Sequence, residues 1–280
     1  MLRARLKHEI ALPQLRLDQI PALAAVAFQT AGIRLDENKL DFMQNRLVQR
    51  VLDSQAGSFR CYIDLLDSDA IERQTFVECL TVHTTSFFRD LAQYNWLRDI
   101  ALPELTQHSS NIVLWSAACS TGQEGWTSLM VTDEFRRQHG KFFNCQLIGT
   151  DVSTAVVKQA SRAVYLQNEL NDVSDEVRHR YFLRARNQDG RYRISPELRS
   201  NADWRVANLT TGDGLRGISA DVAFLRNVLI YFSRQTQREV VDRVVNNIRP
   251  GGYLFTGHSE TGFKHPDLIA VHPSIFQKVI

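Results

Sequence analysis

The chain has 280 residues, of which 44% are hydrophobic and 23% charged, a composition typical of a folded globular protein. With 33 basic and 31 acidic residues its net charge is only +2, so no strong overall field favours nucleic acid or anionic lipid as a partner. No apolar run approaches the roughly 20 residues that cross a bilayer, and the N-terminal stretch MLRARLKHEI lacks the apolar core of a secretory signal. The sequence therefore predicts a cytoplasmic protein.

Residues 1–88 show only helical patterns. Leu40, Met43, Leu47 and Val51 recur at the spacing of one helix face, Tyr62, Leu65 and Leu66 also recur at helical spacing, and short breaks at 31–32 and 55–58 separate the helices. We therefore expect an all-helical N-terminal domain over residues 1–88.

Residues 89–280 change character, because short apolar runs now alternate with helical segments. Strands are expected at 112–115, 146–151, 221–225, 253–256 and 275–279, and helices at 124–139, 153–163 and 235–248, the last stopped by Pro250-Gly251-Gly252. This alternation predicts an α/β fold with a Rossmann-like, doubly wound parallel sheet and helices on both faces.

One polar, arginine-rich segment, residues 181–205, does not fit that alternation. Short strand-like runs such as 192–194 flank a turn at Gln188-Asp189-Gly190, which indicates a small antiparallel β insertion. An irregular polar loop is the alternative interpretation.

The cysteines and histidines do not suggest a metal site. Cys61, Cys79, Cys119 and Cys145 form no CxxC pair, and no HExxH motif is present. We expect no bound metal and, in a protein without an export signal, free thiols.

A run of small residues, 116–122, follows the first strand and precedes the helix that contains Glu124. In a doubly wound sheet this is the carboxyl edge, where small residues let a ligand approach the backbone. The run lacks the GxGxxG fingerprint, and a carboxylate at 124 would repel a pyrophosphate but pair with a cation. A tight turn without a ligand is the alternative.

Asp151 ends the second strand, where a carboxylate typically accepts hydrogen bonds from ribose hydroxyls. Taken alone, this residue would be read as a helix cap. Combined with the small-residue turn it indicates an adenosine-containing ligand, and the missing glycines favour one without phosphates. S-adenosylmethionine is the candidate cofactor.

Four separate motifs occur in order along the chain: TSFFR at 85–89, STGQE at 120–124, RNVLIYF at 226–232 and GHSE at 257–260. Together they make residues 35–262 similar to the chemotaxis receptor methyltransferases, the CheR family. That resemblance implies methyl transfer from S-adenosylmethionine to glutamate side chains of the cytoplasmic helical bundles of chemoreceptors. The products would be glutamate methyl esters and S-adenosylhomocysteine, made for adaptation in bacterial chemotaxis.

The resemblance also implies roles for individual residues. Arg89 and Tyr231 would lie at the reacting end, as catalytic residues. Cofactor contacts are implied at His83, Thr85, Arg89 and Glu124, at Asp151 on the ribose, at Asn208 and Leu209 beside the adenine, and at Arg226 and Asn227. Without the motif, Tyr231 would be read as a core aromatic residue.

Three positions depart from the family pattern. His83 stands where the family commonly has Asn, which puts that cofactor contact in doubt. Gln123 replaces the first residue of a usual Glu-Glu pair, and Gly125-Trp126 replaces a usual Pro-Tyr. None of these changes removes a group that the chemistry needs.

The implied reaction needs no general base, because a glutamate with a pKa of about 4.3 is already ionised at neutral pH. Catalysis would come from positioning the reactants and excluding water. An arginine at the site could orient either the incoming carboxylate or the carboxylate of the cofactor, and the sequence leaves both roles open.

The expected partners are chemoreceptors, and we expect a monomer. Arg46 and Arg50 share one helix face, which would suit an acidic receptor helix; a solvated face balanced by Asp41 and Asp53 is the alternative. The β insertion would be a second contact, adding a strand from a peptide at the receptor's C-terminus.

Rival functions receive less support. A module that senses S-adenosylmethionine without turnover would be expected to have lost residues such as Arg89 or Glu124. A methyltransferase for another substrate is disfavoured only by the family resemblance. A nicotinamide dehydrogenase would need the glycine fingerprint, and a nucleic-acid methyltransferase would be expected to carry more positive charge.

Overall fold

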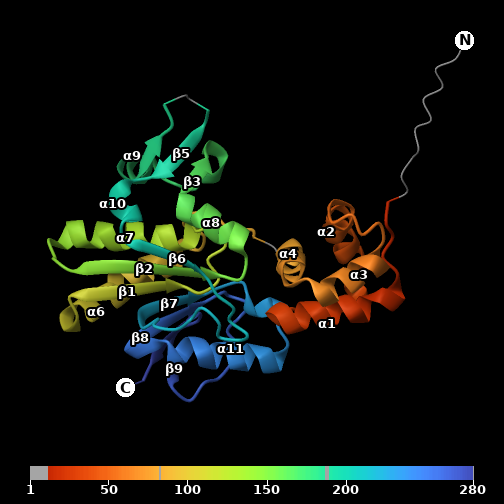
Figure 1. Cartoon of the computed structure of the whole chain (residues 1–280). Coiled ribbons are helices and arrows are strands. Elements are labelled where there is room, and N and C mark those ends of the chain that lie inside the picture. Colours follow the sequence, from red (N-terminus) through yellow and green to blue (C-terminus); the bar gives the residue numbers. More distant parts are fainter. Residues whose placement is uncertain (1–11, 82, 187–188, 280) are drawn as a thin grey trace, which may run out of the picture. The chain divides into compact units, whose positions relative to one another are not determined.

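A computed structural model describes residues 12–81, 83–186 and 189–279, and the chain divides into two compact units between residues 81 and 82 (Figure 1). The boundary that the sequence suggested, after residue 88, therefore falls inside the second unit. All four cysteines are free. No helix in the described ranges is long and apolar enough to cross a membrane, and no group of three metal-ligating side chains gathers there.

The first unit is helical, as predicted. It contains η1 (Leu17–Gln19), α1 (Ile20–Ala31), η2 (Glu37–Lys39), α2 (Leu40–Asp53), α3 (Phe59–Ser68) and α4 (Ala70–Leu80). Helix α4 packs against α1, α2 and α3. Met43, Leu47 and Val51 are fully buried, which confirms the face expected from their spacing. Asp69 begins α4 as its cap, because its carboxylate accepts two backbone N–H groups of the first turn.

The second unit is built on a seven-stranded sheet in the order β6-β2-β1-β7-β8-β10-β9. Its strands are β1 (Asn111–Ser116), β2 (Asn144–Asp151), β6 (Ala202–Val206), β7 (Ala220–Leu225), β8 (Ile248–Thr256), β9 (Leu268–His272) and β10 (Ile275–Lys278). The strands from β6 to β8 are parallel, as predicted. The parallel arrangement does not extend to the other edge, where β10 runs antiparallel to β8 and β9. A two-residue turn joins β9 to β10, and so short a link can connect only antiparallel strands.

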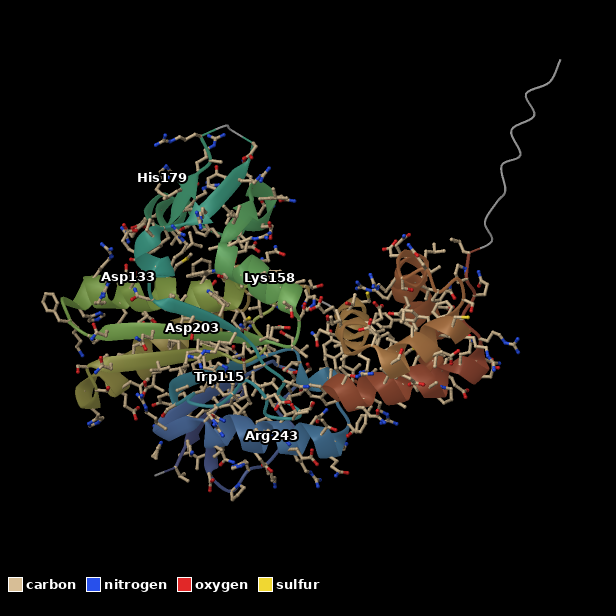
Figure 2. All side chains as sticks on the ribbon, in the orientation of Figure 1. Trp115, Asp133, Lys158, His179, Asp203 and Arg243 are labelled. Carbon is tan, nitrogen blue, oxygen red and sulfur yellow. The ribbon has the colours of Figure 1, made fainter. Side chains whose placement is uncertain are left out.

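Two hydrophobic clusters lie on opposite faces of this sheet. Leu114 packs in one cluster with Trp126 of α7 (Gln123–His139), and the next residue, Trp115, packs in the other with Val241 of α11 (Arg234–Asn246). Figure 2 shows Trp115 in the sheet layer, between α7 with Asp133 and α11 with Arg243. The remaining helical segments outside the small sheet are α5 (Leu91–Trp96), η3 (Leu97–Ala101), α6 (Leu102–His108), α8 (Thr154–Arg162) and η5 (Leu229–Tyr231). Helices therefore cover both faces, as expected for a doubly wound fold.

The expected helix stop at 250–252 is wrong. Helix α11 ends at Asn246, and these residues lie within β8, where the pairing with β7 shifts register. Proline and glycine are tolerated in a strand at such an irregularity.

The β insertion is confirmed, because its strands form a three-stranded antiparallel sheet in the order β3-β5-β4. These strands and the helices between and after them are together called the small sheet below. It comprises β3 (Val164–Leu166), η4 (Gln167–Leu170), α9 (Asp175–Tyr181), β4 (Phe182–Arg184), β5 (Arg191–Ile194) and α10 (Pro196–Arg199). The bounds predicted for it, 181–205, are wrong at both ends, because β3 precedes them and β6 belongs to the main sheet. Gln188 of the expected turn lies outside the described residues.

Trp204 of β6 fills a groove lined by three glycines. A Cβ at Gly149 would lie 2.2 Å from its indole ring, and a Cβ at Gly125 or Gly122 would lie 3.1 Å from it. Trp126 adds an aromatic contact with a ring separation of 5.1 Å. The absence of three side chains therefore lets β2 and the start of α7 pack directly against one indole ring.

Candidate active site

The loop between β1 and α7, residues 117–122 and called the cofactor loop below, has an unusual backbone. Ser120 has φ 50° and Gly122 has φ 96°, both in the left-handed region. At Gly122 a side chain would also meet Ala160 of α8, 2.8 Å from an added Cβ. Glycine is thus required there, and the loop lies at the carboxyl edge of the sheet, as predicted.

Asp151 holds this loop from the end of β2. One of its carboxylate oxygens accepts the backbone N–H of Ser120 at 2.9 Å, and the other accepts that of Ser153 at 3.0 Å. Burial raises the pKa of Asp151, while these N–H donors and the nearby His83 oppose the shift. An ionised carboxylate has about four lone-pair positions, so acceptor capacity remains for ribose hydroxyls.

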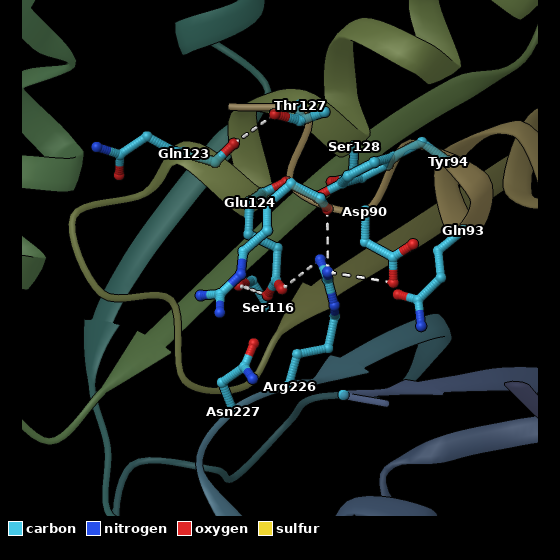
Figure 3. A network of polar contacts seen from close by, with 12 residues as sticks. Asp90, Gln93, Tyr94, Ser116, Gln123, Glu124, Thr127, Ser128, Arg226 and Asn227 are labelled. Carbon is cyan, nitrogen blue, oxygen red and sulfur yellow. Dashed lines mark hydrogen bonds and ion pairs between the residues drawn. The ribbon is translucent and has the colours of Figure 1, made fainter. Parts of the chain in front are cut away.

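Glu124 and Arg226 form the charged centre of the site, shown in Figure 3. An Arg226 guanidinium nitrogen lies 3.2 Å from the Glu124 carboxylate, whose other oxygen accepts the Ser116 hydroxyl at 2.6 Å. Both side chains are largely buried. Burial raises the pKa of Glu124, and Arg226 and Ser116 hold that rise in check.

Arg226 also ties this centre to the segment that carries the TSFFR motif. It donates to the backbone carbonyl of Arg89 at 3.0 Å and lies 3.7 Å from the carboxylate of Asp90. Its guanidinium stands over the Tyr94 ring at 5.9 Å. Its pKa is raised, because the neighbouring Glu124, Tyr94 and Asp90 outweigh the lowering caused by burial.

The expected cofactor-contacting residues of the segment 83–90 differ in how they lie at the site. The Arg89 side chain is exposed and donates to the carbonyl of Thr84 at 3.1 Å, so its backbone rather than its guanidinium meets Arg226. Thr85 is half-buried, and the carbonyl of His83 accepts the Ser120 hydroxyl at 3.4 Å. This segment therefore borders the cofactor loop.

Asn208 and Leu209 follow β6, beside Asp151, whose carbonyl accepts the N–H of Ala207 at 2.9 Å. The Asn208 side chain accepts the backbone N–H and the hydroxyl of Thr210 and so shapes its own turn. The Leu209 side chain is 7% exposed and belongs to the hydrophobic cluster under α11. The loop that contains these two residues thus lies at the expected edge of the sheet, while their side chains are engaged within the turn and in the hydrophobic cluster.

Glu260 of the GHSE motif is a site residue to which the sequence assigned no role. Its carboxylate accepts the backbone N–H groups of Asn227 at 2.5 Å, Leu229 at 2.7 Å and Gly257 at 3.1 Å. It thereby fixes the turn after β7, where Asn227 has φ 58° and η5 carries the half-buried Tyr231. The available signal was that the GHSE motif and the RNVLIYF motif occur in the same chain. The spacing of two motifs, however, does not show that a carboxylate from one binds the backbone of the other.

Arg50 in the helical unit has a different role from the one expected. It pairs with Glu72 of α4, donating at 2.7 Å through Nε and making a second contact through its terminal nitrogen. Glu72 also accepts the Tyr62 hydroxyl at 2.7 Å. The alternative prediction, that Asp41 and Asp53 balance the charge of Arg50, is therefore wrong, because Glu72 does so. The guanidinium of Arg46 lies 5.7 Å from the centre of the Phe42 ring.

Two family models match the chain. The model "CheR methyltransferase, SAM binding domain" matches residues 83–275, and "CheR methyltransferase, all-alpha domain" matches residues 18–81. This chain belongs to the CheR methyltransferase family. "Chemotaxis protein methyltransferase 2" of Pseudomonas aeruginosa is 34% identical over 83% of this chain and 82% of its own length. "Chemotaxis protein methyltransferase" of Escherichia coli is 33% identical over 87% of this chain and 84% of its own length.

The CheR domain binds S-adenosylmethionine, and the polar groups at this edge fit that cofactor. The site offers one buried carboxylate beside a guanidinium and a second at the end of β2, which suit an ammonium group and ribose hydroxyls. The Asp90 carboxylate lies 2.7 Å from the His258 imidazole. The Nε atom of Arg226, by contrast, is buried with no hydrogen-bond partner in the described part of the chain. Such groups are normally satisfied, which is consistent with a polar ligand at this place.

Proposed function

We propose that the protein transfers a methyl group from S-adenosylmethionine to glutamate side-chain carboxylates of chemoreceptors, giving glutamate methyl esters and S-adenosylhomocysteine. The observation that carries the proposal is the Glu124–Arg226 pair beside Asp151, in a chain whose two family models together cover both units. The names of the relatives supply the class of substrate. The protein would act in the cytoplasm as a monomer.

When bound, S-adenosylmethionine supplies a methyl group on a sulfonium: a carboxylate oxygen forms the new C–O bond while the C–S bond breaks and its electron pair stays on sulfur. Glu124 would pair with the amino group of the cofactor, and Asp151 would accept its ribose hydroxyls. Asn208 and Leu209 would lie beside the adenine, with His83, Thr85, Arg226 and Asn227 completing the contacts.

The chain then has two tasks at the reacting end. Arg89 would orient a carboxylate with its exposed guanidinium. Tyr231, on the turn fixed by Glu260, would line the path of the methyl group or hold the attacking oxygen. No proton has to move, because the attacking carboxylate is already ionised and the products are a neutral ester and a thioether.

Chemoreceptor recognition would involve the helical region, residues 1–88. Of the expected arginine pair, Arg50 is engaged by Glu72, whereas Arg46 forms no ion pair with the described residues. The small sheet would bind a receptor C-terminal peptide by strand addition, which calorimetric titration with receptor-tail peptides tests. Absence of heat at high peptide concentration would exclude this tether.

The deciding experiment is labelled methyl transfer from S-adenosylmethionine to membranes that contain candidate chemoreceptors. We expect base-labile label on a receptor band, and loss of that label in Arg89→Ala and Tyr231→Phe at unchanged melting temperature. Arg216→Ala, an exposed arginine in the loop before β7, is the matched control. Cofactor binding without label on any receptor would contradict the proposed activity.

A further inference from the structure

The small sheet contacts the cofactor loop directly, through Tyr165 of β3. This tyrosine is 1% exposed, and its hydroxyl donates to the backbone carbonyl of Thr121 at 2.7 Å. Phe87 packs edge-on against its ring at 4.9 Å, which fixes where the hydroxyl points. Burial raises the pKa of Tyr165 well above its usual range, so the hydroxyl stays protonated and remains a donor.

A second contact comes from Glu169 of η4. One of its oxygens accepts the Gln123 side-chain amide at 3.2 Å, and the other accepts the backbone N–H of Leu166 at 2.8 Å. The side-chain oxygen Oε1 of Gln123 in turn accepts the Thr121 hydroxyl at 2.7 Å. Figure 3 shows that the side chains of Gln123 and Glu124 diverge, with Glu124 directed toward Arg226 and Gln123 away from it.

These two contacts fall on either side of Gly122. Its φ of 96° is one that residues with a side chain rarely adopt, and its backbone packs closely against Ala160 and Trp204. On its other side the loop is held by Asp151 through Ser120. Backbone hydrogen bonds from Cys119 to Thr150 and from Gly122 to Cys119 also shape the loop. The contacts from the small sheet add restraints at Thr121 and Gln123, the residues that flank Gly122.

We propose that Tyr165 and Glu169 are positioning residues for the cofactor loop, acting through Thr121 and Gln123, so that the small sheet sets the affinity for S-adenosylmethionine. The inference rests on the proposed binding of the cofactor at this loop. If the binding-competent loop conformation is populated less often, the apparent dissociation constant rises in inverse proportion to its population. Loss of one buried hydrogen bond of about 1 kcal/mol corresponds to about a fivefold change.

The first test compares two tyrosines that are cross-strand neighbours in the small sheet. Tyr165 and Tyr192 are register partners, but among the described residues it is the Tyr165 hydroxyl that donates to the cofactor loop. Titration calorimetry with S-adenosylhomocysteine should give a dissociation constant three- to tenfold higher for Tyr165→Phe and unchanged for Tyr192→Phe. A merely structural role would lower the melting temperature of Tyr165→Phe and leave the dissociation constant, measured well below that temperature, as in the wild type.

The second test exchanges the partners of the other contact. Gln123→Glu places two carboxylates opposite each other and should weaken binding. The double variant Gln123→Glu/Glu169→Gln restores one amide and one carboxylate in reversed order, and should recover most of the affinity. This test also decides the matter if Tyr165→Phe fails to fold.

The outcomes separate the inference from the proposed function. Wild-type protein that does not bind S-adenosylhomocysteine would contradict the proposed function itself. Wild-type binding together with unchanged affinity in Tyr165→Phe, or with a double variant no better than Gln123→Glu, would overturn the positioning role alone.

Discussion

Removal of Arg226 tests the candidate site most directly. This residue is 8% exposed, and it contacts the Glu124 carboxylate, the Arg89 carbonyl and the Tyr94 ring. In Arg226→Met an uncharged side chain of similar length replaces the cation. Glu124 is then left buried beside Ser116 without a counter-charge.

The magnitude follows from these contacts. Removing one partner of a buried ion pair lowers the free energy of unfolding by about 3–5 kcal/mol, because the remaining charge is uncompensated. Glu124 limits the loss by taking up a proton, since burial already raises its pKa, at a cost of about 1.4 kcal/mol for each pH unit above that pKa. We therefore expect a loss of about 3 kcal/mol, which lowers the melting temperature of a unit of this size by roughly 6–12 °C.

Scanning calorimetry on three proteins measures this effect: the wild type, Arg226→Met, and the double variant Arg226→Met/Glu124→Gln. The double variant should recover part of the loss, because it no longer buries an unpaired charge. A wild-type melting temperature in Arg226→Met, or a double variant as unstable as the single one, would refute the reasoning.

Three further predictions concern acid, glycine and helix contacts. As the pH falls from neutral through the raised pKa of Glu124, its carboxylate gains a proton. Calorimetry should therefore show weaker S-adenosylhomocysteine binding already at pH values above 4.5, the ordinary pKa of a glutamate. Glu124→Gln should remove most of this pH dependence. In Gly257→Ala the new Cβ would lie 2.5 Å from a carboxylate oxygen, so the dissociation constant should rise and the melting temperature fall, whereas Gly262→Ala, with open space around it, should match the wild type in both measurements. Arg50→Met should lower the stability of the helical unit in urea unfolding by about 2 kcal/mol, less than the loss of a fully buried pair because Arg50 is partly exposed. The stabilisation from Glu72, whose pKa Arg50 lowers, should be present above the ordinary carboxyl pKa and be lost as the pH falls through the lowered value; an acid-unfolding curve identical in wild type and Arg50→Met would contradict this.

The sequence predicted those parts of the fold that rest on local patterns. The strands β1, β2 and β7 are short, largely buried apolar runs. The charged residues that end or follow them, Glu124, Asp151 and Arg226, lie at one edge because parallel strands share their carboxyl ends. Strand β9 was missed, since its central residues are exposed and show no apolar alternation. Strand β6 was assigned to the insertion, because polar residues surround Trp204.

The candidate site was predictable to a similar extent. Glu124 and Asp151 follow from their places after two strands, and Arg226 from its motif. The partners that hold them do not follow, because Asp90, Glu260 and Glu169 come from segments distant in sequence and act on backbone groups or on single side chains. Residue spacing carries no information about such contacts.

The three glycines around Trp204 have a consequence for how this chain can diverge. One indole ring takes up the space of three absent side chains. A substitution of Gly149 or Gly125 by a larger residue could therefore be accepted only after Trp204 had been replaced by a smaller residue. Mutations that arise in the opposite order would be removed by selection. Homologues should therefore carry either the indole with all three glycines or a smaller residue with some of them replaced, and sequencing related chains would show whether intermediate combinations occur.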